Sequence, residues 1–465
     1  MTAPEPCDLL VTGGLVVTVD AARRVISDGA IAVRGGQIVA IGTTAELSPR
    51  WSATRRIDAE GGVVHPGYVD GHFHAGLHLI RGALPDDPKT PADPTRPGPF
   101  ARWLNALTEA DEAASTRLAA CEMAMNGFTG FVEAATAFFP DVVSDAAAGV
   151  GIRSSVTDCM LWDLPDGEPL ATLIPRAPCD AARAMAGLGG QLWRNAQSVL
   201  GRGHVGIYGS GSASDALMAE AKRLADASGS VMHQHQSFTP GEARIDHDRY
   251  GKPALVHFAE AGLIGPSSVF THMNALTEAE TEAVVASGMA VVWHPGNTVY
   301  YGLTPHSPNR FPALCRAGTD IAFGTDVAKV WSFGDLGFIG YLLSREWGDY
   351  VPPESILEMF TRGGARAMGM ADRIGCLEVG RAADFVIRSA NSPEVAPGFD
   401  PVRHLVLIQR TKGVRTVVCD GAVIVEEGRP TQVDLAEVLA EARASARRTA
   451  ERADLSPAPL WAASR

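Results

Sequence analysis

His72 and His74 are separated by one residue. They come at the end of a short strand-like segment that follows His65-Pro66-Gly67. On a β-strand, residues two apart point to the same side and lie about 6.8 Å apart along the chain. Both imidazoles can therefore bind one metal ion, since imidazole is the commonest protein ligand for first-row metals. A lone His-x-His pair is more often found on the surface, so this interpretation depends on the residues downstream.

Three further segments that read as short strands also end in ligand-type residues. His235 follows Val231-Met232, His272 follows Ser268 to Thr271, and Asp326 follows Ile321 to Thr325. In a parallel barrel all strands end at the same rim, so these side chains are expected to meet the first pair at one point. His233 points the same way as His235, so either could supply the ligand on that strand.

Strand-like and helix-like segments alternate between residues 67 and 374, which is typical of parallel βα units. Eight such units predict a (β/α)8 TIM barrel, an α/β fold. The candidate strands end near His74, Ala134, Thr157, Ser210, His235, His272, His294 and Asp326. Thr277 to Glu280 has the spacing of a capping box, so Glu280 is predicted to be structural.

The two ends of the chain have the same sequence pattern, which is typical of short β-hairpins. Residues 1–66 and 375–432 are predicted to form one small β-sandwich domain, and residues 433–465 a C-terminal helix and tail. The predicted helix, Val433 to Ala450, is amphipathic. It could pack on a neighbouring subunit or be exposed to solvent, and the sequence does not favour either arrangement. The Pro/Asp-rich segment 84–99 follows the first barrel strand, so it is expected on the catalytic rim, as a lid or a surface loop.

The composition is that of an anionic enzyme. The chain has 465 residues, a net charge of −13 and no basic run, which argues against nucleic acid and acidic membranes as partners. Its seven scattered cysteines include no Cys-x-x-Cys pair, which fits a reducing cytoplasm. No signal peptide or membrane span is expected. We expect a cytoplasmic homo-oligomer, a dimer or tetramer, that acts on a small molecule.

Taken together, these motifs are those of a known family. They are His65-Pro66-Gly67-Tyr68-Val69-Asp70-Gly71-His72-Phe73-His74, Val231-Met232-His233-Gln234-His235, Thr271-His272, Gly324-Thr325-Asp326 and Gly380-Arg381-Ala382-Ala383-Asp384. Over nearly all of residues 8–430 the chain resembles the amidohydrolase superfamily of metal-dependent hydrolases. The resemblance implies His72, His74, His235 and Asp326 as metal ligands and His272 near metal and substrate. In similar deaminases the second histidine of His-x-His-x-x-Glu is the ligand, which favours His235 and leaves His233 as the alternative.

The resemblance also implies how many metal ions are bound. Two-metal members carry a bridging lysine or glutamate on the fourth strand, but residues 204–210 contain neither. One divalent ion per chain is therefore expected; His and Asp ligands suit zinc, cobalt, manganese or iron, and we favour zinc or cobalt. Asp326 is suited to take a proton from a metal-activated water and pass it to the leaving group, with His272 as the second catalytic residue.

One position departs from the deaminase pattern. Deaminases and dechlorinases of the superfamily place a glutamate three residues after the strand-five histidine, where it protonates a ring nitrogen. That position is Phe238 here, or Gln236 if His233 is the ligand. Without this acid a heteroaromatic ring is not easily made electrophilic, whereas a carbonyl or thiocarbonyl carbon already is.

The missing acid guides the substrate prediction. The chain resembles most closely the herbicide-hydrolysing branch with molinate hydrolase and phenylurea hydrolase, which implies a neutral carbamate, thiocarbamate, urea or amide. Phe238, Asn297, Trp331 and His272 are predicted to bind this substrate in a largely apolar pocket. The alternative is a deaminase or chlorohydrolase acting on a nitrogen heterocycle of triazine or nucleobase type. A non-catalytic scaffold is disfavoured because all five ligand-type residues are present.

Overall fold

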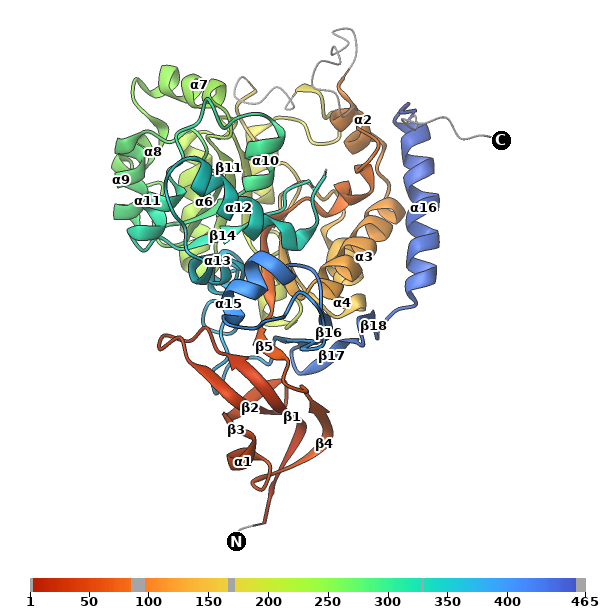
Figure 1. Ribbon diagram of the computed structural model, residues 1–465. Helices are drawn as coiled ribbons and strands as arrows, with labels where there is room; N and C mark the ends of the chain where they lie inside the picture. The colour runs from red at the N-terminus through yellow and green to blue at the C-terminus, as the bar shows by residue number, and fades with distance from the viewer. Residues whose placement is uncertain (1–2, 85–96, 166–171, 328–329, 457–465) are drawn as a thin grey trace.

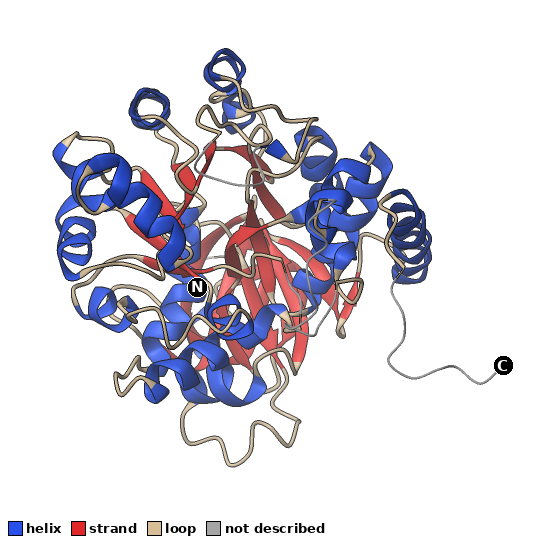
Figure 2. Ribbon diagram, turned by 90° about the horizontal axis from the view of Figure 1, so that it is seen from above, coloured by secondary structure: helices blue, strands red, loops and turns tan. Residues whose placement is uncertain are grey.

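A computed structural model describes residues 3–84, 97–165, 172–327 and 330–456. It consists of a strand-rich part at one end and an α/β barrel above it (Figure 1). Viewed from above, the strands occupy the centre and helices surround them (Figure 2). No helix in the described ranges is long and apolar enough to cross a membrane.

The barrel strands occur where the sequence predicts them. They are β6 Tyr68–Phe73, β7 Phe128–Glu133, β8 Arg153–Val156, β10 Val205–Gly209, β11 Met232–Gln236, β12 Ser268–His272, β13 Ala290–Trp293 and β14 Ile321–Phe323. β6 to β8 pair in parallel, as do β10 to β14, and a short strand β9, Gly201–Gly203, extends the first set. The α/β barrel fold is thus confirmed.

Hydrogen bonds between the two sets of strands complete the ring. On one side Phe73 and Asp326 form a parallel bridge, and the Asp326 N–H donates to the His72 carbonyl oxygen at 2.9 Å. On the other side the His204 N–H donates to the carbonyl oxygen of Val156 at 3.1 Å. The carboxyl ends of β6 and β14, which carry His72 and Asp326, are therefore held directly beside each other.

Helices and helical turns connect the strands around the outside. Their bounds are η1 Ala75–Ile80, α2 Pro99–Ala106, α3 Glu109–Met125, α4 Pro140–Val150, α5 Ala181–Gly187, η3 Leu192–Ala196, α6 Asp215–Ser228, α7 Pro240–Tyr250, α8 Ala254–Glu260, α9 Glu278–Ser287, α10 Pro295–Tyr300, α11 Phe311–Arg316, η4 Phe333–Asp335, α12 Leu336–Glu346, α13 Pro353–Glu358, η5 Met359–Gly363 and α14 Gly364–Ala367. Helix α9 begins with the predicted capping box, in which Glu280 accepts from the Thr277 N–H at 2.8 Å, so the structural role of Glu280 is confirmed.

A nine-stranded sheet below the barrel combines both ends of the chain. Its order is β18-β17-β16-β15-β5-β1-β2-β3, with β4 beside β1. The bounds are β1 Glu5–Val17, β2 Val25–Arg34, β3 Gln37–Thr43, β4 Trp51–Asp58, β5 Val63–Pro66, β15 Phe385–Arg388, β16 Val414–Cys419, β17 Ala422–Glu426 and β18 Arg429–Pro430, with short helical segments α1 Thr44–Leu47, α15 Pro401–Arg403 and η6 His404–Gln409. The sheet contains strands from both predicted segments, residues 1–66 and 375–432. The boundaries of these segments as a separate domain stay a prediction.

The two parts are connected by a buried ion pair. Arg153 on β8 donates from Nε and Nη2 to the two carboxylate oxygens of Asp384, each at 2.8 Å. Its Nη2 also donates to Asp420 at 2.8 Å, next to β16. Both the guanidinium and the Asp384 carboxylate are shielded from solvent. A charge at the base of the barrel is thus neutralised by the sheet beneath it.

The C-terminal helix α16 spans Leu435–Arg452 and runs along the outside of the barrel beside α3 (Figure 1). The Ser445 hydroxyl donates to the Asp111 carboxylate at 2.7 Å, and Arg117 pairs with Glu441. One face of this helix therefore packs on its own chain, a possibility that the sequence analysis did not consider. The predicted lid cannot be compared, because residues 85–96 lie outside the described ranges.

Candidate active site

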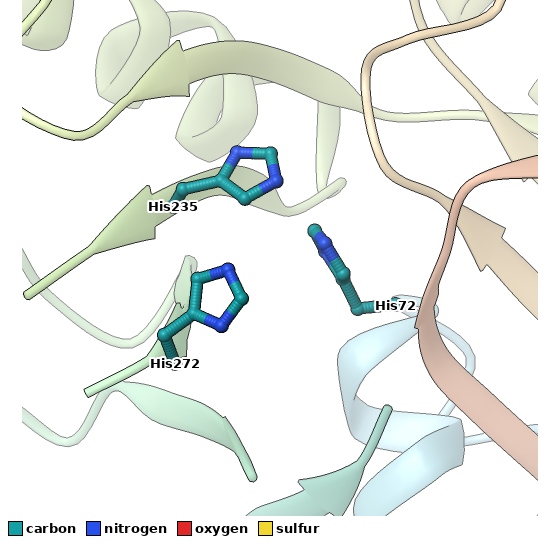
Figure 3. A group of neighbouring side chains, drawn as sticks. All are labelled: His72, His235 and His272. Carbon is teal, nitrogen blue, oxygen red and sulfur yellow. The ribbon is translucent and has the colours of Figure 1, made fainter. Parts of the chain in front are cut away.

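Three histidines from three barrel strands turn their rings toward one another. They are His72 on β6, His235 on β11 and His272 on β12 (Figure 3). Their nitrogens lie within 4.8 Å of one another, and all three side chains are buried. His72 Nε2, His235 Nε2 and His272 Nδ1 have no hydrogen-bond partner among the described residues. Buried nitrogens without a partner are costly unless something else binds them.

His74 and Asp326 join the same centre. His74 Nε2 lies 3.0 Å from Asp326 Oδ1, and these two residues form a second possible ligand group with His72. The other ring nitrogen of His74, Nδ1, is hydrogen bonded to the Thr136 hydroxyl at 2.7 Å, and Thr136 in turn donates to Glu133 at 3.1 Å. Such outer partners fix the orientation of a ligand ring.

The structure separates the two histidines of β11. His235 Nδ1 donates to the Tyr208 carbonyl oxygen at 2.7 Å, which directs Nε2 toward His72 and His272. His233 Nε2 instead donates to the Ala367 carbonyl oxygen at 2.7 Å. His233 belongs to none of the ligand groups found among the described residues. This geometry favours His235 over His233, as the resemblance did.

His294, which ends a predicted strand but was not among the predicted ligands, also lies within this cluster. Its ring centroid is 4.7 Å from that of His272, and its nitrogens belong geometrically to a third group with His272 and Asp326. Both nitrogens are already used, however: Nδ1 donates to the Gly324 carbonyl oxygen at 2.7 Å, and Nε2 bonds to the Thr271 hydroxyl. His294 therefore supports the ends of β12 and β14.

Burial keeps the imidazoles of His72, His235 and His272 neutral. Desolvation, followed by the neighbouring His74 ring, lowers the pKa of His235 to about 3. Desolvation also lowers the pKa values of His72 and His272 well below the ordinary value, with neighbouring histidines adding to the shift. Neutral imidazole is the form that binds a metal ion, so no proton has to be removed at neutral pH.

The backbone leaves the strands in an unusual conformation at this rim. His272 has φ of 72° and Asp326 has φ of 59°, in the left-handed region that residues other than glycine seldom adopt. Asp70 helps to hold the rim, since its carboxylate accepts from the backbone N–H groups of His72 and Thr325, each at 3.1 Å. Strained backbone of this kind is often found at functional sites.

A cavity of about 290 Å³ opens above the histidines. His74, His235, His272 and Asp326 form its polar end, while Leu84, Phe100, Phe238 and Tyr301 contribute apolar surface. Tyr208, Ser210 and Glu242 also line it. No arginine or lysine is among the lining residues that the structure describes.

The predicted substrate-binding residues fall into two groups. Phe238 lines the cavity, with its ring centroid 4.5 Å from that of His272. Asn297 is buried and donates from Nδ2 to the Asp326 carboxylate, which makes it a partner of that residue. Trp331 packs over Gly296, where a Cβ atom would lie 2.8 Å from the indole ring, and is not among the described lining residues. The roles of Asn297 and Trp331 in substrate binding stay predictions.

Several residues of the site were not found from the sequence. Tyr208 and Ser210 end the fourth barrel strand, where only a bridging lysine or glutamate had been sought, so strand position was an available signal. Glu242 lies in helix α7 and Thr136 in a loop. The Thr239-x-x-Glu242 spacing was an available helix-start signal for Glu242, whereas no sequence motif marks Thr136.

The donor set fits a divalent metal ion. It consists of buried imidazole nitrogens, three of which lack a hydrogen-bond partner among the described residues, and one carboxylate. His/Asp sets of this kind are typical of zinc and of other first-row metals.

Comparison with known proteins agrees with this geometry. The model of the Amidohydrolase family matches residues 63–424. The chain belongs to the amidohydrolase family. A separate model, the imidazolonepropionase-like composite domain of bacteria, matches residues 29–51. The family assignment explains why the barrel and the flanking sheet occur together.

Relatives over the whole chain carry the names of deaminases. A 5-methylthioadenosine/S-adenosylhomocysteine deaminase of Syntrophobacter fumaroxidans is 31% identical over 95% of this chain and 98% of its own. A 5'-deoxyadenosine deaminase of Methanosarcina mazei is 27% identical over 94% of this chain and 98% of its own. The zinc-bound crystal structure of an adenosine deaminase from Xanthomonas campestris has a TM-score of 0.86 and 26% identity, covering 96% of this chain and 100% of that one.

These findings establish a metal-dependent amidohydrolase, an enzyme that hydrolyses C–N bonds with a divalent metal ion such as zinc as its cofactor. They favour the heterocycle deaminases over the predicted molinate and phenylurea hydrolase branch.

Proposed function

We propose that this enzyme hydrolytically removes an amino group from a neutral nitrogen heterocycle of the aminopurine type. One observation carries the proposal: the cluster of buried histidines and Asp326 opens into a cavity with apolar walls, in a chain whose full-length relatives are named as deaminases of adenine nucleosides. This replaces the predicted carbamate or urea substrate as the first choice.

We propose that His72, His74, His235 and Asp326 hold the metal ion and that His272 lies beside the reacting carbon. The ion, when bound, supplies Lewis acidity that makes a water molecule nucleophilic at neutral pH. Asp326 takes a proton from the attacking water and gives it to the departing amine, because its carboxylate lies at the polar end of the cavity. Asn297 orients this carboxylate through its hydrogen bond.

The shape and charge of the cavity support a flat, uncharged substrate. Phe238 and Tyr301 contact each other edge to face, with centroids 5.5 Å apart, and present aromatic surface to a ring. A tyrosine hydroxyl keeps its proton at neutral pH, so that of Tyr301 is available as a hydrogen-bond donor. Because the described lining contains no cationic side chain, a substrate group such as a phosphate has no partner there.

A second candidate is hydrolysis of a neutral carbamate, thiocarbamate, urea or amide. A specific observation favours it: the apolar Phe238 occupies the position at which deaminases of the superfamily carry the glutamate that protonates the ring. Substrates of this class have an electrophilic carbon already and do not need the missing acid.

The two candidates are separated by their products. The purified, zinc-loaded enzyme is incubated with 5'-methylthioadenosine, S-adenosylhomocysteine, 5'-deoxyadenosine and adenosine, and in parallel with a phenylurea and an N,N-dialkyl thiocarbamate. Ammonia release from a nucleoside, with the loss of the adenine absorbance, is the expected result. Aniline or thiol release from the last two compounds, without reaction of the nucleosides, would favour the second candidate instead.

A further inference from the structure

Glu242 is a carboxylic acid in the cavity that the roles given above do not use. Resting on the proposed deamination, we propose that Glu242 supplies the proton for the ring nitrogen of the substrate, in place of the glutamate that Phe238 has replaced. The two positions are only four residues apart in the sequence, at the junction of β11 and α7. The proposed acid thus lies in the first turn of the helix that follows the strand.

The local structure explains how a helix residue reaches this place. Thr239 is the N-cap of α7, and its hydroxyl accepts from the Glu242 N–H at 3.2 Å. In a capping box the glutamate at this position would bond back to the N-cap N–H. Glu242 reaches one residue further, and its Oε2 accepts from the Phe238 N–H at 3.2 Å. Its carboxyl group therefore lies at the backbone of the residue from which the usual glutamate side chain would extend.

The position of Glu242 in the cavity fits the role. It lines the same cavity as His272 and Asp326. The Phe238 side chain is turned toward His272, with the ring centroids 4.5 Å apart, and Glu242 lines the cavity beside it. A substrate ring bound in this cavity would therefore have Glu242 among its neighbours, as well as His272 and Asp326.

The proton balance closes with two carboxyl groups. Glu242 gives its proton to the ring nitrogen while the water oxygen bonds to the adjacent carbon and Asp326 takes one proton of that water. Asp326 then protonates the amino group, the C–N bond breaks and ammonia leaves. The remaining hydroxyl becomes a carbonyl and returns its proton to Glu242. The net reaction consumes one water and yields the oxo-heterocycle and ammonia, with no other reactant.

The test compares two substitutions that a structural role and a chemical role affect differently. Glu242→Gln keeps an oxygen that accepts from the Phe238 N–H but cannot supply the proton, whereas Glu242→Ala removes both functions. We expect kcat for nucleoside deamination to fall at least ~100-fold in both variants, with KM changed less than about threefold and zinc content unchanged. Glu46→Gln is the matched control, because Glu46 has the same position in the capping box of α1, in the flanking sheet region.

The outcomes are distinguishable. A Glu242→Gln enzyme with wild-type kcat and an impaired Glu242→Ala enzyme would reduce Glu242 to a helix cap and overturn this inference, while the proposed deamination would stand. If the wild-type enzyme releases no ammonia from any of the nucleosides, both the proposed function and this inference are overturned. Equal loss of kcat in the two Glu242 variants, with Glu46→Gln unaffected, supports the inference.

Discussion

The two histidines of β11 form a natural pair for testing the metal site. His235 presents to the cluster a nitrogen that has no hydrogen-bond partner in the described part of the chain, whereas His233 donates to the Ala367 carbonyl oxygen. We expect His235→Ala to lose both zinc and activity, and His233→Ala to keep about one zinc ion per chain. Metal analysis of the two purified variants after dialysis measures this difference. Zinc retained by His235→Ala and lost from His233→Ala would reverse the assignment.

Asp326 accepts hydrogen bonds from the Asn297 amide and from the Val327 N–H, and this makes the isosteric substitution informative. Its carboxylate meets His74 on one oxygen and the Asn297 amide on the other. An asparagine at 326 would turn an NH2 group toward one of them and could not accept the proton of the water. We expect Asp326→Asn to lower kcat at least ~100-fold, measured at full zinc loading. A smaller loss would show that another group takes the proton.

At the residue scale, the sequence predicted those functional residues that lie at the ends of barrel strands. His72, His74, His235, His272 and Asp326 could be placed together because parallel strands end at one rim. Glu242 could not be found in this way, since its position depends on a bent capping interaction one residue longer than the standard one. The partners of the ligands, such as Thr136, come from loops whose paths no periodicity predicts.

Among the elements, β8 and the flanking sheet are connected by the Arg153–Asp384 pair, and its burial determines its contribution. Asp384→Ala would leave a buried guanidinium with Asp420 as its remaining carboxylate partner. We expect the free energy of unfolding to fall by about 3–5 kcal/mol, measured by urea denaturation. Glu426→Ala, which removes the exposed pair with Arg55, is expected to cost no more than about 1 kcal/mol. Similar losses in both variants would contradict the role given to burial.

Element types and order could be predicted well because their signals are local. The capping box of α9 and the apolar runs of the barrel strands lie within a few residues of one another. The partner of α16 could not be predicted, because an amphipathic pattern specifies an apolar face but not what covers it. The ion pairs with α3 that fix its position involve residues more than 300 positions apart, as Arg117 and Glu441 are.

For the whole molecule, buried carboxyl groups make stability depend on pH. Desolvation, together with the nearby Glu112, raises the pKa of Glu133 to about 8. In the unfolded chain this glutamate has an ordinary pKa of about 4.3, so it loses its proton at a lower pH than in the folded protein. The contribution of Glu133 to the free energy of unfolding therefore falls as the pH rises from about 4.3 to about 8. We expect the unfolding free energy of wild-type protein to fall relative to that of Glu133→Gln by up to about 1.4 kcal/mol per pH unit.

Denaturation of both zinc-saturated proteins at pH 5, 6, 7 and 8 measures this difference. Protonation of the metal ligands also changes stability with pH, but it does so equally in both proteins when both are saturated with zinc. The difference between the two proteins therefore reports Glu133 alone. Parallel curves across the four pH values would show that Glu133 is already ionised in the folded enzyme.

The sheet below the barrel also sets an order of events during synthesis. Strand β5 pairs with β15, through Val64 and Ile387 among others, so the amino-terminal strands leave the ribosome long before their neighbour has been made. Until then an unpaired strand edge is exposed, which is a known route to aggregation. A chain ending at residue 374 is therefore expected to collect in the pellet when produced in cells, although it contains every barrel strand. Recovery of that chain in the supernatant would show that the barrel protects the nascent edge without help from the other end.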